Sequence, residues 1–374
     1  MLSPIILLFY QENGLNYKHL FLFQGIFYLT SIISEFPAGF FCDKMSRRNV
    51  LLVSFSIYIV VIVLWLCFHG FFIILIGEIL FAISKVCMDN ATSCYLYDFL
   101  SKKNNTKEMP KQYSYLNFFL ALGTAAAGII GAKIFEEYGS AILLTIELIL
   151  MLIAVKLILK LPNIGSTNKE RKSKRIFLNT AKEIFNNNLI KYHICYSGIL
   201  TAFSILFAIS FQPLMQHASI PIIVFGIIAS INHGTRAFFS ILSEYVIKYI
   251  KINNLALYLY ILYIIALCML IICSKTTNQV LIISMLIIIC LIIGLQLIFT
   301  INHIARIHKY INKENRGCLM SVNNIVSRGL AAVYLISSKM LLNVINLSLF
   351  YEIFLIIFVV SSSYIMYKTY KTGE

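Results

Sequence analysis

The sequence predicts an all-α polytopic membrane protein, and three observations lead to that prediction. Hydrophobic residues make up 59% of the 374 residues and charged residues only 13%. The mean hydropathy is +0.83. The apolar residues also form successive stretches of about 20, the length that an α-helix needs to cross the hydrocarbon core of a bilayer. A soluble domain of this size would need far more polar surface than these residues can provide.

Taken in order, the apolar stretches predict eleven complete spans. They lie near residues 18–40, 49–69, 71–98, 112–135, 139–161, 189–216, 221–246, 255–273, 279–305, 317–340 and 347–368. A further apolar stretch, residues 1–10, is about half as long as the ~20 residues that a crossing requires. We therefore expect a partial helix 1 whose inner half is missing from a chain that starts at Met1.

The longest polar segment, residues 162–188, predicts a basic cytoplasmic linker between two domains. The first domain is an N-terminal bundle, residues 1–161, with helices 1 to 6. The second is a C-terminal bundle, residues 189–374, with helices 7 to 12. Within the linker, apolar residues recur at helical spacing over residues 176–185, which predicts an amphipathic helix on the inner leaflet. A regulatory site in the same segment is the alternative.

The formal net charge of +15 comes from lysines and arginines in the short segments between the spans. Because they are not gathered on one basic face, they indicate membrane topology and no nucleic-acid partner. Alternating the spans across the bilayer places nearly all of them on one side, which is then cytoplasmic, together with the C-terminus. We expect a monomer in the inner (plasma) membrane.

A charged motif separates the second predicted span from the third. It reads Gly39-x-x-x-Asp43-Lys44-x-x-Arg47-Arg48, and we expect residues 35–48 to form a turn on the cytoplasmic side. The motif resembles the loop between helices 2 and 3 of the major facilitator superfamily, with Ser46 where the family usually has glycine. The resemblance implies two six-helix bundles, a substrate site between them near the bilayer midplane, and transport by alternating access.

Two further motifs extend this resemblance to a prokaryotic, efflux-like subset of the superfamily. They are Tyr97-Asp98 at the end of the fourth helix and Arg316 at the start of the eleventh. The resemblance implies that Asp98 accepts a salt bridge from Arg47 and that Asp43 faces the start of helix 11. Such contacts would join the two halves on the inner side and break as the transporter opens. The predicted cytoplasmic gate comprises Gly39, Asp43, Lys44, Arg47, Arg48, Asp98 and Arg316.

Charged residues within the predicted spans indicate a second site, since each costs roughly 2.5–3.5 kcal/mol on insertion scales. At 100° per residue, Glu78, Lys85 and Asp89 share one face of their helix. Lys85 and Asp89 are also i,i+4 neighbours. In the C-terminal half, polar stripes contain Arg236 on one helix and Asn324 and Arg328 on another. These six residues form the predicted substrate or coupling cavity. The alternatives are a Lys85–Asp89 pair that only fixes helix packing and an Arg236 that extends to the membrane surface.

The predicted function is secondary transport of a small organic solute, with protons as the coupling ion and Asp89 or Glu78 as the carrier. Export of a drug, toxin or peptide-like metabolite is preferred because the subset contains efflux-type members. Uptake of an anionic or zwitterionic metabolite is the alternative, and a transport-inactive receptor or a membrane enzyme remains open. The sequence contains no P-loop or nucleophile–base pair, and its nine cysteines include no CxxC pair, so it predicts no enzyme, metal or cofactor.

Overall fold

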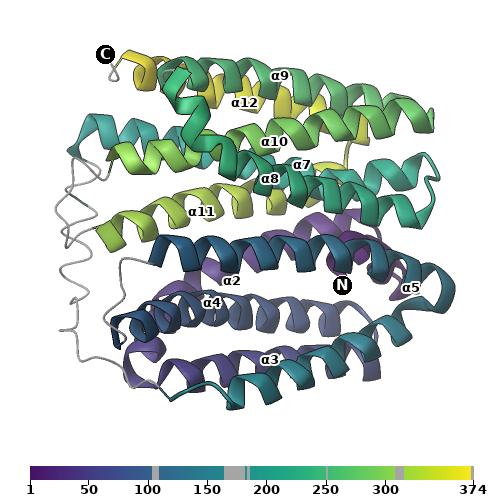
Figure 1. The fold of residues 1–374 in the computed structure, drawn as a ribbon. Helices are drawn as coiled ribbons and strands as arrows, with labels where there is room; N and C mark the ends of the chain where they lie inside the picture. Colours follow the sequence, from purple (N-terminus) through teal and green to yellow (C-terminus); the bar gives the residue numbers. More distant parts are fainter. Residues whose placement is uncertain (103–108, 164–181, 183–185, 250–251, 308–315, 372–374) are drawn as a thin grey trace. The chain divides into compact units, whose positions relative to one another are not determined.

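The computed structural model describes residues 1–102, 109–163, 182, 186–249, 252–307 and 316–371. All regular secondary structure in these ranges is helical (Figure 1). The chain divides into two compact units, Met1–Arg171 and Lys172–Glu374, so the division falls inside the predicted linker. The predicted amphipathic helix at 176–185 lies outside the described residues, apart from Lys182. Each unit is described here by itself.

The first unit begins with a short helical segment that matches the predicted partial helix. A 3₁₀ turn, Ser3–Ile5, leads into α1, Ile6–Glu12. The helices that follow are α2 (Tyr17–Lys44), α3 (Arg47–Cys67), α4 (Phe71–Lys102) and α5 (Met109–Leu159). The last of these contains two of the predicted spans, because Gly139 interrupts it with a non-helical backbone of φ 76° and ψ −178°. This conformation suits glycine, which lacks the Cβ that would clash there.

The second unit contains six consecutive helices. They are α7 (Asn188–His217), α8 (Ile222–Tyr249), α9 (Ile252–Lys275), α10 (Gln279–Ile307), α11 (Arg316–Leu342) and α12 (Leu347–Lys371). Within this unit α10 packs on α8, α12 on α9 and α11 on α7, whereas in the first unit α4 packs on both α2 and α3. Each helix therefore has a face against its neighbours and a face outside the bundle.

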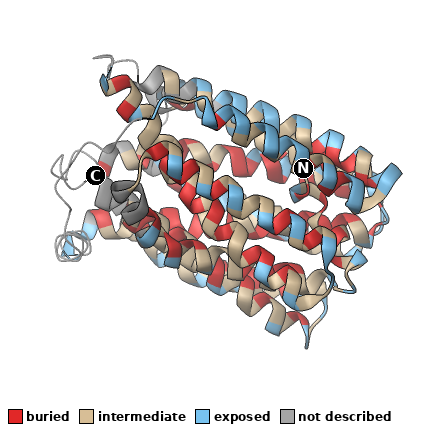
Figure 2. Ribbon diagram, turned by 90° about the horizontal axis from the view of Figure 1, so that it is seen from below, coloured by how far each residue is buried: buried red, intermediate tan, exposed pale blue. Residues whose placement is uncertain are grey.

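The predicted all-helical membrane fold is confirmed. All eleven predicted spans fall on helices, and nine helices in the described part of the chain are long and apolar enough to cross a membrane. Buried and exposed residues alternate along these helices (Figure 2). Large apolar side chains such as Phe72, 73% exposed, and Ile241, 68% exposed, lie on the outside. An apolar outer face of this kind is suited to contact with lipid chains.

The turn predicted over residues 35–48 is much shorter than expected. Helix α2 continues through Pro37 to Lys44, and α3 starts at Arg47, which leaves only Met45 and Ser46 between them. Ser46 has extended backbone angles, and its side chain accepts a hydrogen bond from the amide of Asn49 at 3.4 Å. The residue that departs from the family pattern is therefore the N-cap of α3, a position that serine favours. The charged residues Glu35, Asp43 and Lys44 therefore lie within α2 and do not end it.

Candidate functional site

Arg47 and Asp98 form a buried ion pair. Arg47 is the first residue of α3, and its Nε donates to Oδ2 of Asp98, near the end of α4, at 3.0 Å. Their side chains are only 8% and 7% exposed. The structure therefore contains the contact expected from the motifs. Removing one partner of such a pair would leave an uncompensated buried charge.

The location of this pair corrects one part of the gate prediction. Both residues belong to the first unit, so the pair joins α3 to α4 and does not join one half of the chain to the other. Arg48 makes a similar local contact, because its Nη1 donates to the carbonyl of Leu161 at 3.2 Å. Side-chain environments are not described for four of the predicted gate positions, namely Gly39, Asp43, Lys44 and Arg316. Their gate role stays a prediction.

Glu78 lies in the interior of the first unit, on α4. It is fully buried, and its Oε1 accepts a hydrogen bond from the hydroxyl of Tyr10, on α1, at 2.5 Å. Its second oxygen, Oε2, is buried and has no hydrogen-bond partner among the described residues. The partial first helix thus supplies a direct contact to this carboxylate. Sequence spacing did not indicate this contact, because residues 10 and 78 belong to different helices.

Lys85 and Asp89 lie on the same face of α4 but in a different environment. Their charged atoms are 2.7 Å apart, and their side chains are 37% and 49% exposed. Glu78 is seven residues before Lys85, which corresponds to ~10 Å along the helix axis at 1.5 Å per residue. The predicted stripe is therefore divided into a buried carboxylate and a half-exposed ion pair.

One further buried carboxylate in the first unit was not identified from the sequence. Glu147, in the second half of α5, is 4% exposed, and its Oε1 accepts a hydrogen bond from the Tyr58 hydroxyl of α3 at 2.5 Å. The α-amino group of Met1 lies 3.4 Å from the same oxygen. Glu147 interrupts an apolar run just as Glu78 does, so the signal that identified one residue could have identified the other.

In the second unit, the predicted cavity residues lie on α8 and α11. Arg236 of α8 is exposed, whereas Asn324 and Arg328 of α11 are half-buried. Next to Arg236, the Thr235 hydroxyl donates to the carbonyl of Cys290 at 3.1 Å and so connects α8 to α10. The exposure of Arg236 agrees with either a solvent-facing role or extension to the membrane surface. Its part in a cavity stays a prediction.

The interior of the second unit contains a neutral polar network that the sequence did not indicate. The side-chain amide of Gln296, on α10, donates to the hydroxyls of Thr201 at 3.0 Å and Thr300 at 2.8 Å. Ser204 donates to the Gln296 amide oxygen at 3.5 Å and lies 2.5 Å from the Tyr263 hydroxyl. Helices α7, α9 and α10 are thus joined by hydrogen bonds without any formal charge.

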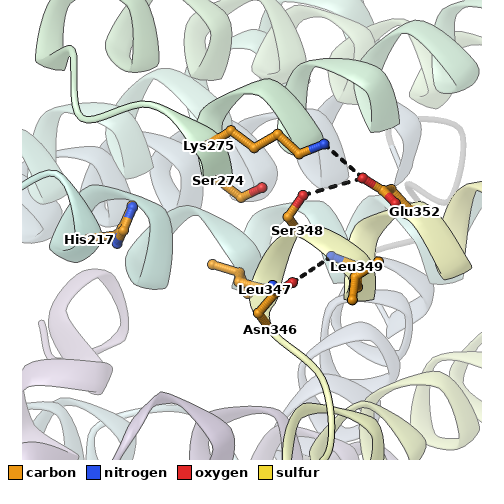
Figure 3. Close-up of a pocket in the computed structure, with 8 residues that line it drawn as sticks. All are labelled: His217, Ser274, Lys275, Asn346, Leu347, Ser348, Leu349 and Glu352. Carbon is orange, nitrogen blue, oxygen red and sulfur yellow. Dashed lines mark hydrogen bonds and ion pairs between the residues drawn. The ribbon is translucent and has the colours of Figure 1, made fainter.

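The second unit also has an open recess of about 580 Å³ at the end where α7 and α9 finish and α12 begins (Figure 3). Lys275 of α9 and Glu352 of α12 form a 2.8 Å ion pair at its edge, and both are exposed. Ser348 donates to the same carboxylate at 3.4 Å. The charge distribution of the sequence predicts that this is the outer end, and that orientation stays a prediction.

The profile of the Major Facilitator Superfamily matches residues 1–335. The chain belongs to this superfamily. The match confirms the resemblance inferred from the motif at Gly39 to Arg48. An uncharacterized MFS-type transporter, YxaM, of Bacillus subtilis (strain 168) is 22% identical over 204 residues, which cover 54% of this chain and 50% of that protein. The chain thus aligns with about half the length of this curated relative.

Two solved structures of a nucleoside transporter share the fold. The crystal structure of a point mutant of the nucleoside transporter NupG matches with a TM-score of 0.77 at 14% identity, covering 98% of this chain and 94% of that one. A second crystal structure of NupG matches with a TM-score of 0.71 at 16% identity, covering 95% of this chain and 91% of that one. At such identities the likeness shows the major facilitator fold and says nothing of the substrate.

Proposed function

We propose that this major facilitator protein exports a small organic solute by alternating access, in exchange for protons. Membership of the superfamily supports transport, and favours it over the membrane enzyme or inactive receptor left open by the sequence. The observation that carries the proton coupling is the buried Glu78, whose one described partner is a tyrosine hydroxyl. The protein would act as a monomer in the inner membrane, with its C-terminus in the cytoplasm.

The physical argument for a proton concerns the cost of burying charge. An ionised carboxylate in an apolar interior is very unfavourable unless a cation or several hydrogen bonds compensate it, and otherwise the group takes up a proton. Glu78 accepts one hydrogen bond from Tyr10 and has a second oxygen without a partner among the described residues. A conformational change that exposes this oxygen to water would release the proton.

The environments of the two predicted carriers favour Glu78 over Asp89. Asp89 is half-exposed and its charge is balanced by Lys85 at 2.7 Å, so it can stay ionised without a proton. Glu78 has no such cation among its described contacts. We therefore assign the carrier role to Glu78 and treat Asp89 as the alternative, which the double variant in the Discussion tests.

Uptake is the second candidate for direction. The structures that match this chain include a nucleoside transporter, and Lys85, Arg236 and Arg328 supply cationic groups suited to an anionic or zwitterionic solute. Export is preferred because the motifs around Gly39 and Asp98 resemble those of an efflux-like subset. Both directions use the same proton carrier, so the coupling test does not depend on which is correct.

Transport in vesicles with an imposed pH gradient tests this proposal. Ethidium would serve as the export probe and radiolabelled uridine as the uptake probe, in vesicles containing wild-type protein, Glu78→Gln or Glu136→Gln. Glu136 is an exposed glutamate of α5 and provides a matched control. We expect gradient-dependent movement of one probe with wild type and Glu136→Gln, and its loss with Glu78→Gln, while exchange without a gradient persists. Gradient-independent movement in all three would contradict proton coupling.

A further inference from the structure

The proposed function does not use the open recess at the ends of α7, α9 and α12. Its volume, about 580 Å³, lies in the range of sites that bind small molecules. The lining contains one ammonium, one carboxylate and several neutral polar groups (Figure 3). These groups belong to Lys275, Glu352, His217, Ser274, Asn346 and Ser348. With histidine counted as neutral, the recess has no net charge, which favours a ligand that is itself neutral or zwitterionic.

Lys275 and Glu352 bond each other and retain groups for a ligand. The ammonium donates to Oε1 of Glu352 at 2.8 Å, which uses one of its three N–H donors. Ser348 donates to the same oxygen at 3.4 Å, so both bonds that the carboxylate accepts in the described part of the chain end on Oε1. The two charged side chains are 59% and 40% exposed, so a ligand can reach both. The pair therefore presents donors for an anion next to an acceptor for a cation.

An apolar stripe extends from each member of this pair along its helix. At 100° per residue, Lys275 of α9 and Glu352 of α12 each lie within about 80° of three exposed apolar side chains on the same helix. These are Ile261, Ile265 and Ile272 on α9, and Leu349, Ile356 and Val360 on α12. Because α9 ends and α12 begins at the recess, both stripes run from the recess along the outside of the bundle. The two helices also pack on each other, so the stripes form a surface suited to contact with acyl chains.

The charged pair and the stripes together fit a phospholipid with a zwitterionic head group. Its phosphate would accept hydrogen bonds from Lys275, and the N-terminal turn of α12, which lines the recess, also favours an anionic group. A primary ammonium would donate to Glu352. A quaternary ammonium has no N–H to donate. A head group with a net negative charge would meet the carboxylate without a cation to balance it.

We propose that this recess binds phosphatidylethanolamine, whose phosphate bonds Lys275, whose ammonium bonds Glu352 and whose acyl chains lie on the stripes of α9 and α12. The inference does not rest on the proposed transport function, because Glu78 and Tyr10 belong to the first unit and the recess belongs to the second. At the predicted outer end of the bundle, the lipid would come from the outer leaflet.

Photo-crosslinking of the purified full chain in dodecyl maltoside micelles tests the site. The probe is phosphatidylethanolamine with a diazirine near the ester of one acyl chain, and mass spectrometry locates the attachment points. We expect cross-links on the α9 and α12 stripes next to the recess. Unlabelled phosphatidylethanolamine should compete there about three- to fivefold better than phosphatidylcholine with the same acyl chains, the effect that one exposed charged contact supplies. Cross-links only elsewhere, or equal competition by the two lipids, would overturn the proposal.

Two single changes test the two ends of the head group separately. Glu352→Gln removes the charged acceptor for the ammonium, so the preference for phosphatidylethanolamine should vanish. Lys275→Gln removes the donor to the phosphate, which both lipids contain, so both should compete less well while their ratio persists. Lys133→Gln and Glu137→Gln are matched controls, because they alter an exposed pair within α5 that does not line the recess, and they should change neither value. A preference that survives in folded Glu352→Gln would overturn the proposal.

Glycerophosphoethanolamine distinguishes a lipid from a water-soluble zwitterion. It contains the same head group without acyl chains, so it should not displace the probe at the concentration at which phosphatidylethanolamine does. Displacement at that concentration would assign the recess to a soluble zwitterion and overturn the lipid assignment. The competition measured on the wild-type chain decides this point without any variant.

Discussion

The two bundles differ in the kind of polar group that each buries. Every buried aspartate, glutamate and arginine among the described residues lies in the first unit: Arg47, Glu78, Asp98 and Glu147. The second unit buries amides, hydroxyls and imidazoles, among them Gln296, Ser204 and the stacked pair His193 and His303. Among the described residues, the first bundle thus buries carboxylates and a guanidinium, whereas the second buries uncharged amides and hydroxyls together with one pair of imidazoles.

This difference suggests that the two bundles respond differently to changes in protonation. A neutral network such as that around Gln296 makes its hydrogen bonds at a single protonation state, so it holds helices together at any physiological pH. A buried carboxylate with one tyrosine partner changes its interactions when a proton arrives or leaves. The following predictions test whether charge in the first bundle and neutrality in the second determine how each responds to substitution.

The largest effect is expected at Arg47 and Asp98. Either Arg47→Gln or Asp98→Asn leaves its partner charged and buried, which should lower the free energy of unfolding by about 3–5 kcal/mol. The double variant should cost little more than either single change, because the stranded charge is gone. Thermal unfolding of the purified variants, followed by size-exclusion chromatography, measures this. Additive losses would show that the pair is not a direct one.

The next effect concerns close helix packing in each bundle. An added Cβ at Gly77 of α4 would overlap the indole of Trp65, whereas one at Gly198 of α7 would lie 2.8 Å from Cγ1 of Val326. Gly77→Ala should therefore destabilise by roughly 1–3 kcal/mol, since a large buried ring must move. Gly198→Ala should cost less, because a smaller side chain can yield. Equal melting temperatures for the two variants would contradict this ranking.

Gln296→Ala tests the neutral network. It removes the donor to Thr201 and Thr300 and the acceptor for Ser204. Each of these hydroxyls keeps another hydrogen bond, so the total loss of stability should be about 1–2 kcal/mol. Because no charge is involved, the loss should be the same at pH 6 and at pH 8. A pH-dependent loss would mean that a titrating group is coupled to the network.

The smallest effect is expected for the half-exposed pair. Removing both charges with Lys85→Met and Asp89→Leu should change stability by less than about 1 kcal/mol, since exposed pairs contribute little. Gradient-driven transport should remain near the wild-type rate. If it is abolished while substrate binding persists, Asp89 carries the proton, and burial is a poor guide to the carrier in this bundle.

Much of the fold could be predicted because each helix that crosses a bilayer needs about 20 mostly apolar residues, and such stretches can be recognised in the sequence. The eleven spans followed from apolar runs, while their ends did not, since helices such as α2 extend past the apolar region. The Lys85–Asp89 and Arg47–Asp98 contacts followed from i,i+4 spacing and from motif resemblance. The partners of Glu78 and Glu147 could not be predicted, because Tyr10 and Tyr58 reach them across helix interfaces that spacing along one helix does not encode.

The Gly139 break in α5 has a consequence for how the chain enters the membrane. The two spans of α5 meet with almost no connecting loop, and the polar residues near the junction, Lys133 and Glu137, lie 3.9 Å apart on its exposed surface. Very little polar backbone must therefore cross the bilayer at this junction. During synthesis the two segments can therefore insert as one unit joined at Gly139.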